Sequence, residues 1–430
     1  MKRLEAKGNC HRSVVPPLQG LARPDRLPRA GLPRAFGPWR HIRIDTFIIG
    51  SIGRLALGAA LGAVVATAPL RGQEMIPRHE ENLSVRNEAD IAIKKGIEWL
   101  RQHQNADGSW SLNDYPALTA LPLWAYMGNP DGTPAEKPDY VRKGYDFIVA
   151  SARPDGGIYR KGLANYNTSI SLVALVLARE PKYDPLIRAA HDFVIGQQAT
   201  GLPDPTMDGG IGYGPTGTAR AHPDLSNTVI ALEAIRRSEA IADKERPGGP
   251  KLDWSAAIQF IQRCQNLPAA NKEPYVSASP DDRGGFMYFP GDSNAGETGT
   301  NGARSYGSMS YAGLLSYIYA DVTKTDPRVT GAVDWLKNHY SVDENPGMGI
   351  DGLFYYYQVM AKALSTYGAP ELALADGRKV NWPKELALKL IDLQQEDGSW
   401  ANESGRWMEK DPVLATAYAV LTLEMVYREM

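Results

Sequence analysis

Residues 394–400, Gln-Gln-Glu-Asp-Gly-Ser-Trp, repeat a stretch that the chain already contains at residues 104–110, Gln-Asn-Ala-Asp-Gly-Ser-Trp. An amphipathic run precedes each copy, over residues 91–104 and 384–394. In both copies Asp-Gly provides a tight turn, and we expect the Trp side chain to fold back over the helix that has just ended. Two such turns in one chain predict a repeat protein.

Glycine-rich variants of this turn lie between the two copies, at residues 154–159, 209–214, 284–288 and 347–349. Each has an amphipathic run before it and an apolar run after it, so the pattern predicts six helix pairs. The expected pairs are 91–104 with 116–126, 140–151 with 167–178, 185–198 with 225–238, 254–265 with 308–320, 327–340 with 353–367, and 383–394 with 413–427.

The two helices of a pair differ in character. First helices are amphipathic and charged, as in residues 94–101, whereas second helices are apolar nearly all round, as in residues 171–178 and 415–423. A helix that is apolar on every side is buried on every side, which favours two concentric layers with the second helices inside. An open solenoid is the alternative, but it would expose apolar helix faces and require polar terminal caps.

The first residues of the chain have a different composition. Residues 1–40 carry six prolines and no period, which indicates a disordered segment or an over-long gene start. In residues 41–72 an apolar run follows Arg54 and ends in small residues near Ala68, as in a signal peptide. An uncleaved anchor is the alternative. We therefore expect an exported protein, periplasmic or secreted, with a linker at 73–87 and one domain at 88–430.

Charge and cysteine content exclude several classes of partner and site. Residues 1–72 hold 12 Lys and Arg and 3 Asp and Glu, so the remainder has 35 basic and 46 acidic residues and a net charge of −11. An acidic chain argues against nucleic acid as a partner. After removal of the leader we expect no transmembrane span. Cys264 would be the only cysteine left, so no internal disulfide is expected.

The Gln-x-x-Asp-Gly-Ser-Trp turns and their glycine-rich variants resemble the repeats of the squalene–hopene cyclase and protein prenyltransferase superfamily, over residues 88–430. The resemblance implies an all-α fold, an (α/α)6 toroid of six helix pairs. It does not by itself imply one reaction, because the same toroid carries terpene cyclisation, protein prenylation and the thioester domains of complement-type proteins.

The acid motif of squalene-type cyclases, Asp-x-Asp-Asp-Thr, is matched only in part. The corresponding stretch is Asp-Leu-Ser-Asn-Thr at residues 224–228, so Asp224 and Thr228 occupy the outer positions. Ser226 stands where the resemblance places the proton donor, and Asn227 where it places the donor's partner. A hydroxyl group is too weak an acid to protonate an alkene, which argues against a squalene-type mechanism. Asp224 is also a natural N-cap for the apolar helix that follows.

The zinc site of the protein prenyltransferases is not matched either. That site needs Asp, Cys and His, but Cys264 has no Asp-x-Cys pattern around it, and the Cys-Gly-Glu-Gln of thioester domains does not occur. We expect no metal and no cofactor. A second candidate for a general acid is the pair Asp281 and Asp282, on a loop that precedes a second helix, although acids in turns are most often simply solvated.

Aromatic residues crowd the second helices and point to an apolar ligand. The candidates for a ligand cavity are Trp124, Tyr306, Tyr311, Tyr317, Phe354, Tyr355 and Tyr418. Such a lining can hold an isoprenoid or a cationic intermediate by dispersion and cation–π attraction, and the alternative is that these side chains fill the core. The leading interpretation is a terpene-cyclase-like protein that binds such a ligand and, if catalytic, acts as an isomerase or lyase. A non-catalytic protein-interaction scaffold is the second interpretation, and a glycan-active enzyme is the third.

Overall fold

The computed structural model describes residues 82–133, 136–214, 222–244, 248–297 and 302–430. The predicted segments 1–40 and 41–72, and most of the predicted linker, lie outside these ranges. The described chain is mostly helical, and none of its helices is both long and apolar enough to cross a membrane.

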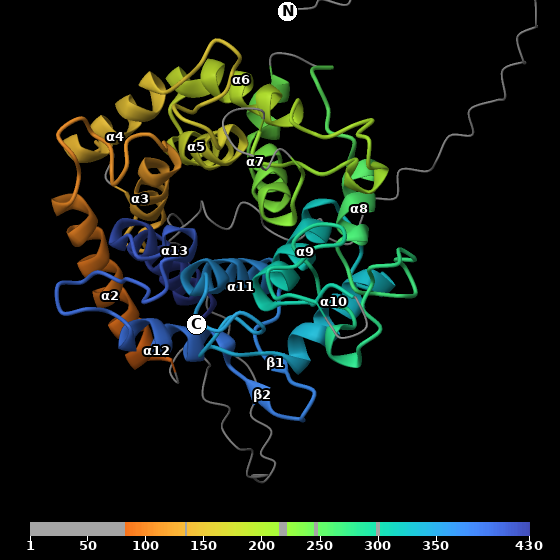
Figure 1. The fold of residues 1–430 in the computed structure, drawn as a ribbon. Coiled ribbons are helices and arrows are strands. Elements are labelled where there is room, and N and C mark those ends of the chain that lie inside the picture. Colours follow the sequence, from red (N-terminus) through yellow and green to blue (C-terminus); the bar gives the residue numbers. More distant parts are fainter. Residues whose placement is uncertain (1–81, 134–135, 215–221, 245–247, 298–301) are drawn as a thin grey trace, which may run out of the picture. The chain divides into compact units, whose positions relative to one another are not determined.

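Twelve α-helices occur in the described ranges, and they alternate as first and second members of pairs (Figure 1). The first helices are α2 (Leu83–Gln102), α4 (Asp139–Ala150), α6 (Asp184–Ile195), α8 (Trp254–Arg263), α10 (Pro327–Asn338) and α12 (Trp382–Asp392). The second helices are α3 (Ala117–Gly128), α5 (Ala164–Ala178), α7 (Leu225–Lys244), α9 (Gly307–Tyr319), α11 (Leu353–Tyr367) and α13 (Pro412–Glu429). Every helix expected from the sequence is therefore present.

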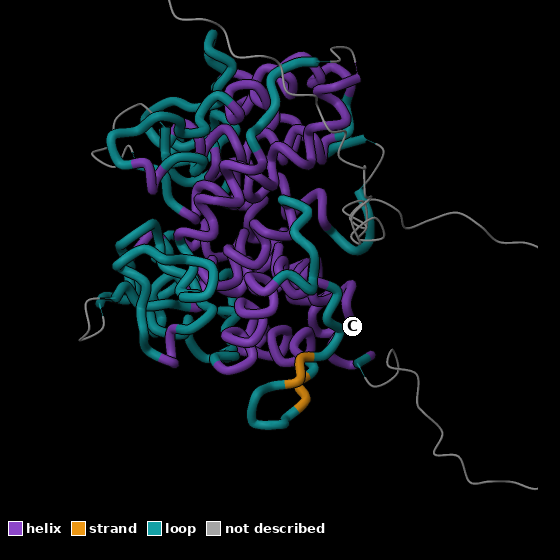
Figure 2. The backbone as a smooth tube through the Cα atoms, turned by 90° about the vertical axis from the view of Figure 1, so that its right-hand side faces the viewer, coloured by secondary structure: helices purple, strands orange, loops and turns teal. Residues whose placement is uncertain are grey.

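Short elements occupy the connections, which Figure 2 shows gathered mainly along one side of the helices. The 3-10 turns are η2 (Pro181–Tyr183), η3 (Pro205–Met207), η4 (Pro280–Asp282) and η5 (Arg406–Met408). Strands β1 (Leu372–Ala373) and β2 (Lys379–Val380) form an antiparallel hairpin in which Leu372 pairs with Val380.

Helix α2 begins at Leu83 rather than at residue 91, inside the segment expected to be a linker. Residues 83–90 are mainly polar, but the few apolar residues among them have helical spacing. Val85 and Ala89 are four residues apart and both are buried, and Ser84 Oγ donates a hydrogen bond to Glu88 Oε1 (3.0 Å).

The two Gln-x-x-Asp-Gly-Ser-Trp turns make the same contacts. Gln104 Nε2 donates to the carbonyl of Gly108 (2.9 Å) and to that of Tyr140 (2.7 Å) at the start of α4. Gln394 Nε2 donates to the carbonyl of Gly398 (3.0 Å) and to that of Ala92 (3.0 Å) in α2. Each glutamine thus fastens its own turn and joins it to another first helix, α4 in one case and α2 in the other.

The tryptophans and glycines of these turns are fixed by packing. Trp110 Nε1 donates to the carbonyl of Leu100 (2.6 Å), and Trp400 Nε1 donates to that of Leu390 (2.8 Å), as the fold-back expectation requires. Gly108 has φ 85°, and a Cβ added there would lie 2.5 Å from the carbonyl oxygen of Lys143 in α4. Only glycine allows both this conformation and this close approach.

The second helices form the core. Every residue of α9 is buried, which confirms the expectation from its apolar composition. Helix α3 contacts α5, α5 contacts α7, and the contacts continue through α9, α11 and α13 to α3. Among the first helices, α12 contacts α2. The contacts among the second helices therefore return to the helix at which they begin.

Candidate functional site

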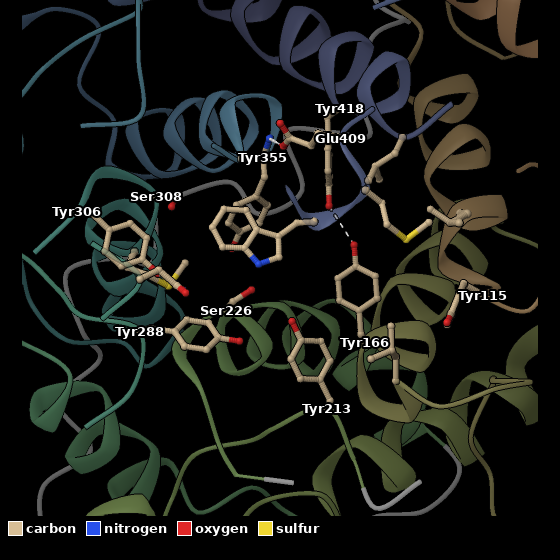
Figure 3. Close-up of a pocket in the computed structure, with 18 residues that line it drawn as sticks. Tyr115, Tyr166, Tyr213, Ser226, Tyr288, Tyr306, Ser308, Tyr355, Glu409 and Tyr418 are labelled. Carbon is tan, nitrogen blue, oxygen red and sulfur yellow. Dashed lines mark hydrogen bonds between the residues drawn. The ribbon is translucent and has the colours of Figure 1, made fainter. Parts of the chain in front are cut away.

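A cavity of about 350 Å³ lies where the second helices begin (Figure 3). Residues at or just before the start of α3, α5, α7, α9, α11 and α13 all contribute to its wall. Seven of the lining residues are tyrosines: Tyr115, Tyr166, Tyr213, Tyr288, Tyr306, Tyr355 and Tyr418. The cavity is thus walled largely by aromatic rings, each of which also carries one hydroxyl group.

Three of the tyrosine hydroxyls make hydrogen bonds to other side chains of the wall. The Tyr166 and Tyr418 hydroxyls lie 3.0 Å apart, and Asn294 Nδ2 donates to the Tyr306 hydroxyl (3.1 Å). Burial raises the pKa of Tyr166 to about 12, so its hydroxyl keeps its proton at neutral pH. These residues offer a ligand both apolar faces and neutral hydrogen-bond donors.

Asp224 lies directly behind the cavity wall. Its carboxylate caps α7 as expected, because Oδ1 accepts from the backbone N–H of Asn227 (2.8 Å) and Oδ2 accepts from Asn227 Nδ2 (2.9 Å). Asp224 is fully buried, whereas Ser226 and Tyr288 beside it line the cavity. Burial raises the pKa of Asp224 to about 7, against the opposing effect of donors from Asn227 and Tyr288.

Tyr288 connects this carboxyl group to the cavity. Its backbone carbonyl accepts from the N–H of Leu225 (2.9 Å), which holds the residue against the first turn of α7. The Tyr288 side chain lies close to the carboxyl group of Asp224 and to the Tyr213 side chain. Figure 3 shows the ends of Tyr288 and Tyr213 directed toward each other and toward Ser226. Asp224, Tyr288 and Tyr213 therefore form one cluster of polar groups at the wall.

Glu409 is a second buried carboxyl group in the wall. It caps α11, since Oε1 accepts from the N–H of Tyr355 (2.8 Å) and Oε2 accepts from the N–H of Phe354 (3.2 Å) and from Asn402 Nδ2 (2.7 Å). Burial raises the pKa of Glu409 above its usual value. No sequence pattern identified Glu409 or Tyr288, because each reaches a helix start that is distant along the chain.

The turn η5 covers part of the cavity. Trp407 and Met408 line the cavity, and both have positive φ (54° and 67°), a conformation that costs energy for residues other than glycine. Arg406 secures the turn, because its guanidinium donates to Asp351 Oδ2 (3.1 Å) and to Asn294 Oδ1 (3.0 Å). No motif in the sequence indicates this cover.

The residues expected to line a cavity divide into two groups. Tyr306, Tyr355 and Tyr418 are in the wall. The other four lie elsewhere in the core: Trp124 beneath Lys362, Tyr311 against the Tyr356 ring, Tyr317 with its hydroxyl 3.0 Å from Gln265 Oε1, and Phe354 against the Tyr357 ring. A second helix is apolar all round, so its sequence does not reveal which face meets the cavity.

The carboxyl groups of Asp281 and Asp282 are not part of the cavity wall. Asp281 is exposed in η4, where its backbone carbonyl accepts from Trp335 Nε1 (2.8 Å). Asp282 is buried and accepts from Ser277 Oγ (2.6 Å) and from the N–H of Ser305 (2.9 Å). In the described residues no three His, Cys, Asp or Glu side chains are grouped so that they could hold a metal ion.

Farther along the same helices, a buried ionic cluster joins α7 and α11. Glu233 accepts from Lys362 Nζ (2.7 Å) and from Arg237 Nε (2.9 Å), and Lys362 Nζ lies 4.6 Å from the centre of the Trp124 ring. Burial opposes ionisation of Glu233, but the two cations outweigh it and hold the pKa of Glu233 below its usual value. This end of the second helices is filled by paired charges.

Among solved structures the chain is similar to type II terpene cyclases, whereas no protein-family profile and no curated protein sequence matches it. Type II terpene cyclase MstE from Scytonema is 10% identical with a TM-score of 0.47, over 80% of this chain and 100% of that chain. A variant of MstE in complex with its substrate, geranylgeranyl dihydroxybenzoate, is 11% identical with a TM-score of 0.47, over 81% and 100%. A protein from Actinoplanes is 14% identical with a TM-score of 0.46, over 79% and 99%.

Proposed function

We propose that the chain is an exported (α/α)6 toroid that binds an apolar, isoprenoid-like ligand in the cavity at the starts of its second helices. The toroid is supported by the cycle of contacts from α3 through α13 back to α3, and by the contact of α12 with α2. Export is supported by the apolar run and small residues within residues 41–72.

The observation that carries the proposal is the cavity itself. Its volume of about 350 Å³ falls in the range of small-molecule sites. Its wall combines aromatic and aliphatic side chains with the hydroxyl groups of the tyrosines and serines, the amide of Asn294 and the carboxyl group of Glu409. No lysine, arginine or histidine is among its described lining residues. Such a site favours an uncharged, mainly hydrocarbon ligand over a phosphorylated one.

Protonation of an alkene is not part of the proposed function. Ser226 occupies the position at which squalene-type cyclases carry their acid, and the carboxyl group of Asp224 has no surface in the cavity. We therefore expect squalene to be recovered unchanged after incubation with the full chain, as measured by mass spectrometry of the lipid extract. A cyclised product would contradict this assignment.

Binding is tested by titrating farnesol into the full chain and following the heat released. Leu163 lines the cavity and is only partly buried, so Leu163→Trp fills part of the cavity without overpacking the core. We expect at least about a tenfold loss of affinity in this variant. Leu388→Trp, on the exposed face of α12, is the matched control and should bind as the unaltered chain does. Equal affinity in both variants, or no binding at all, would overturn the proposal.

A further inference from the structure

We propose that the Tyr288 hydroxyl donates a hydrogen bond to a carbonyl or enolate oxygen of the ligand, and that Asp224 is the positioning residue behind it. The ligand is then an apolar ketone or enone rather than a pure hydrocarbon. The inference rests on the proposed function, since it specifies the ligand of the same cavity.

The position of Tyr288 carries the first step. Its backbone carbonyl accepts from the N–H of Leu225 at the start of α7, which holds the backbone of Tyr288 beside the first turn that Asp224 caps. Tyr288 lines the cavity, with the buried carboxyl group of Asp224 and the Tyr213 side chain close to it. A tyrosine supported by a buried carboxyl group and a second tyrosine is a preorganised donor for a developing oxyanion.

The protonation state of Asp224 decides whether the Tyr288 hydroxyl can donate a hydrogen bond to the ligand. A hydroxyl group has one proton to donate. When Asp224 is ionised, it accepts that proton's hydrogen bond, and Tyr288 offers the ligand only lone pairs. When Asp224 is protonated, it can donate to the Tyr288 oxygen, and the Tyr288 proton is free for the ligand. Asn227 supplies a donor to each Asp224 oxygen and stabilises the ionised form.

This arrangement is pH-dependent near neutrality. Because burial raises the pKa of Asp224 to about 7, the donor to the ligand is present below pH 7 and is lost as the pH rises above it. The titratable groups near Asp224 are Tyr288, Tyr306, Tyr355 and Cys264, and burial raises the pKa of each, so they stay neutral over this range. His222 lies two residues before Asp224 and packs against Phe289 (4.3 Å between ring centroids), so the experiment includes a variant at this histidine.

The Tyr288 hydroxyl should make the cavity prefer ligands that carry an oxygen atom over hydrocarbons. A ligand that carries an oxygen at this point satisfies the Tyr288 hydroxyl, whereas a hydrocarbon of the same shape leaves a largely desolvated donor without a partner. A phenol is too weak an acid to protonate a C=C bond, but it readily polarises a carbonyl oxygen. Tyr288 and Asp224 can therefore act on a carbonyl group of the ligand but not on its C=C bonds.

The test uses 2-acetylnaphthalene and 2-ethylnaphthalene, which differ only in that a carbonyl replaces a methylene group. For the full chain at pH 5.5 we expect 2-acetylnaphthalene to bind about tenfold more tightly than 2-ethylnaphthalene. The infrared carbonyl stretch of bound, ¹³C-labelled 2-acetylnaphthalene should lie at lower frequency than in hexane. At pH 8.5 both the preference and the frequency shift should be lost.

Four variants assign the effect to its residues. Tyr288→Phe should abolish the preference and the carbonyl shift while 2-ethylnaphthalene binds as before, which also shows that the variant folds. Asp224→Asn keeps a capping oxygen, and its carbonyl shift should no longer change with pH. Tyr427→Phe removes a hydroxyl outside the cavity wall, and His222→Gln removes the histidine. Neither variant should alter the affinity preference or the carbonyl shift.

A carbonyl shift that survives in Tyr288→Phe would overturn the inference. Equal affinity for the two naphthalenes in the unaltered chain would also overturn it and leave the proposed function standing, because an apolar ligand would still bind. If neither naphthalene and no isoprenoid alcohol binds, the proposed function and the inference fail together.

Discussion

The two ends of the second helices differ in what fills the space between them. At their starts lies a cavity lined by seven tyrosines, and farther along lies the cluster of Glu233, Lys362, Arg237 and Trp124. Both regions are built from α3, α7 and α11, among other helices. The same helices therefore border a cavity at one end and form a closed, charged core at the other.

The contrast between the ionic cluster and the cavity indicates which polar groups stabilise the fold. A buried charge is tolerated only when its partner is present, so the members of the ionic cluster depend on one another. Removal of a tyrosine hydroxyl at the cavity should lower the free energy of unfolding only slightly, because the ring keeps its apolar contacts. We therefore expect substitutions to affect stability at the ionic cluster and binding at the cavity.

The largest effect is expected from Lys362→Met, which leaves Glu233 with one cation instead of two in a buried site. The free energy of unfolding, measured by urea titration of the full chain, should fall by about 4 kcal/mol. Lys389→Met is the matched control. Its partner Asp343 is well exposed, so the change should stay below about 1 kcal/mol. A loss below 1 kcal/mol for Lys362→Met would remove the distinction between the two ends.

The next effect concerns Asp224 and pH. Its pKa is raised to about 7 in the folded chain, so its contribution to stability is fully present below the unfolded pKa near 4 and is lost as the pH rises through 7. Asp224→Asn removes this dependence. The difference in unfolding free energy, variant minus unaltered chain, should therefore increase by about 3 kcal/mol from pH 5 to pH 8.

Asp326→Asn provides the comparison for that measurement. Asp326 caps α10 beside Arg328, whose guanidinium holds the pKa of Asp326 below its usual value. The stability that Asp326 contributes is therefore present above its unfolded pKa and is lost only as the pH falls below it. Between pH 5 and pH 8 this variant should differ from the unaltered chain by a constant amount. The same constant difference in Asp224→Asn would contradict the assignment.

The smallest effect is expected from Tyr166→Phe at the cavity. The substitution removes one hydroxyl of the pair with Tyr418 and should lower the unfolding free energy by about 1 kcal/mol. Binding of 2-ethylnaphthalene should be unchanged, because the ring remains. A stability loss above 3 kcal/mol would place the cavity wall among the structural elements, together with the ionic cluster.

The helices were predictable because their signals are local. The roles of the turn tryptophans and the cap of α7 by Asp224 also follow from residues close together in sequence. The cavity wall depends on contacts between distant residues. Glu409 caps Tyr355 across 54 positions, and Tyr288 binds the first turn of α7 from a later connection. A helix that is buried all round also gives no indication of which aromatic residues face the cavity.

The central claim is that the starts of the second helices, and not their far ends, hold the ligand. It is tested most directly by photo-crosslinking the full chain with a farnesol analogue that carries a diazirine, followed by peptide mass spectrometry. We expect crosslinks in residues 115–118, 306–309 and 352–355, with excess farnesol suppressing them. Crosslinks confined to the peptides that contain Trp124, Glu233 and Lys362, or spread over the outer surface, would contradict the claim.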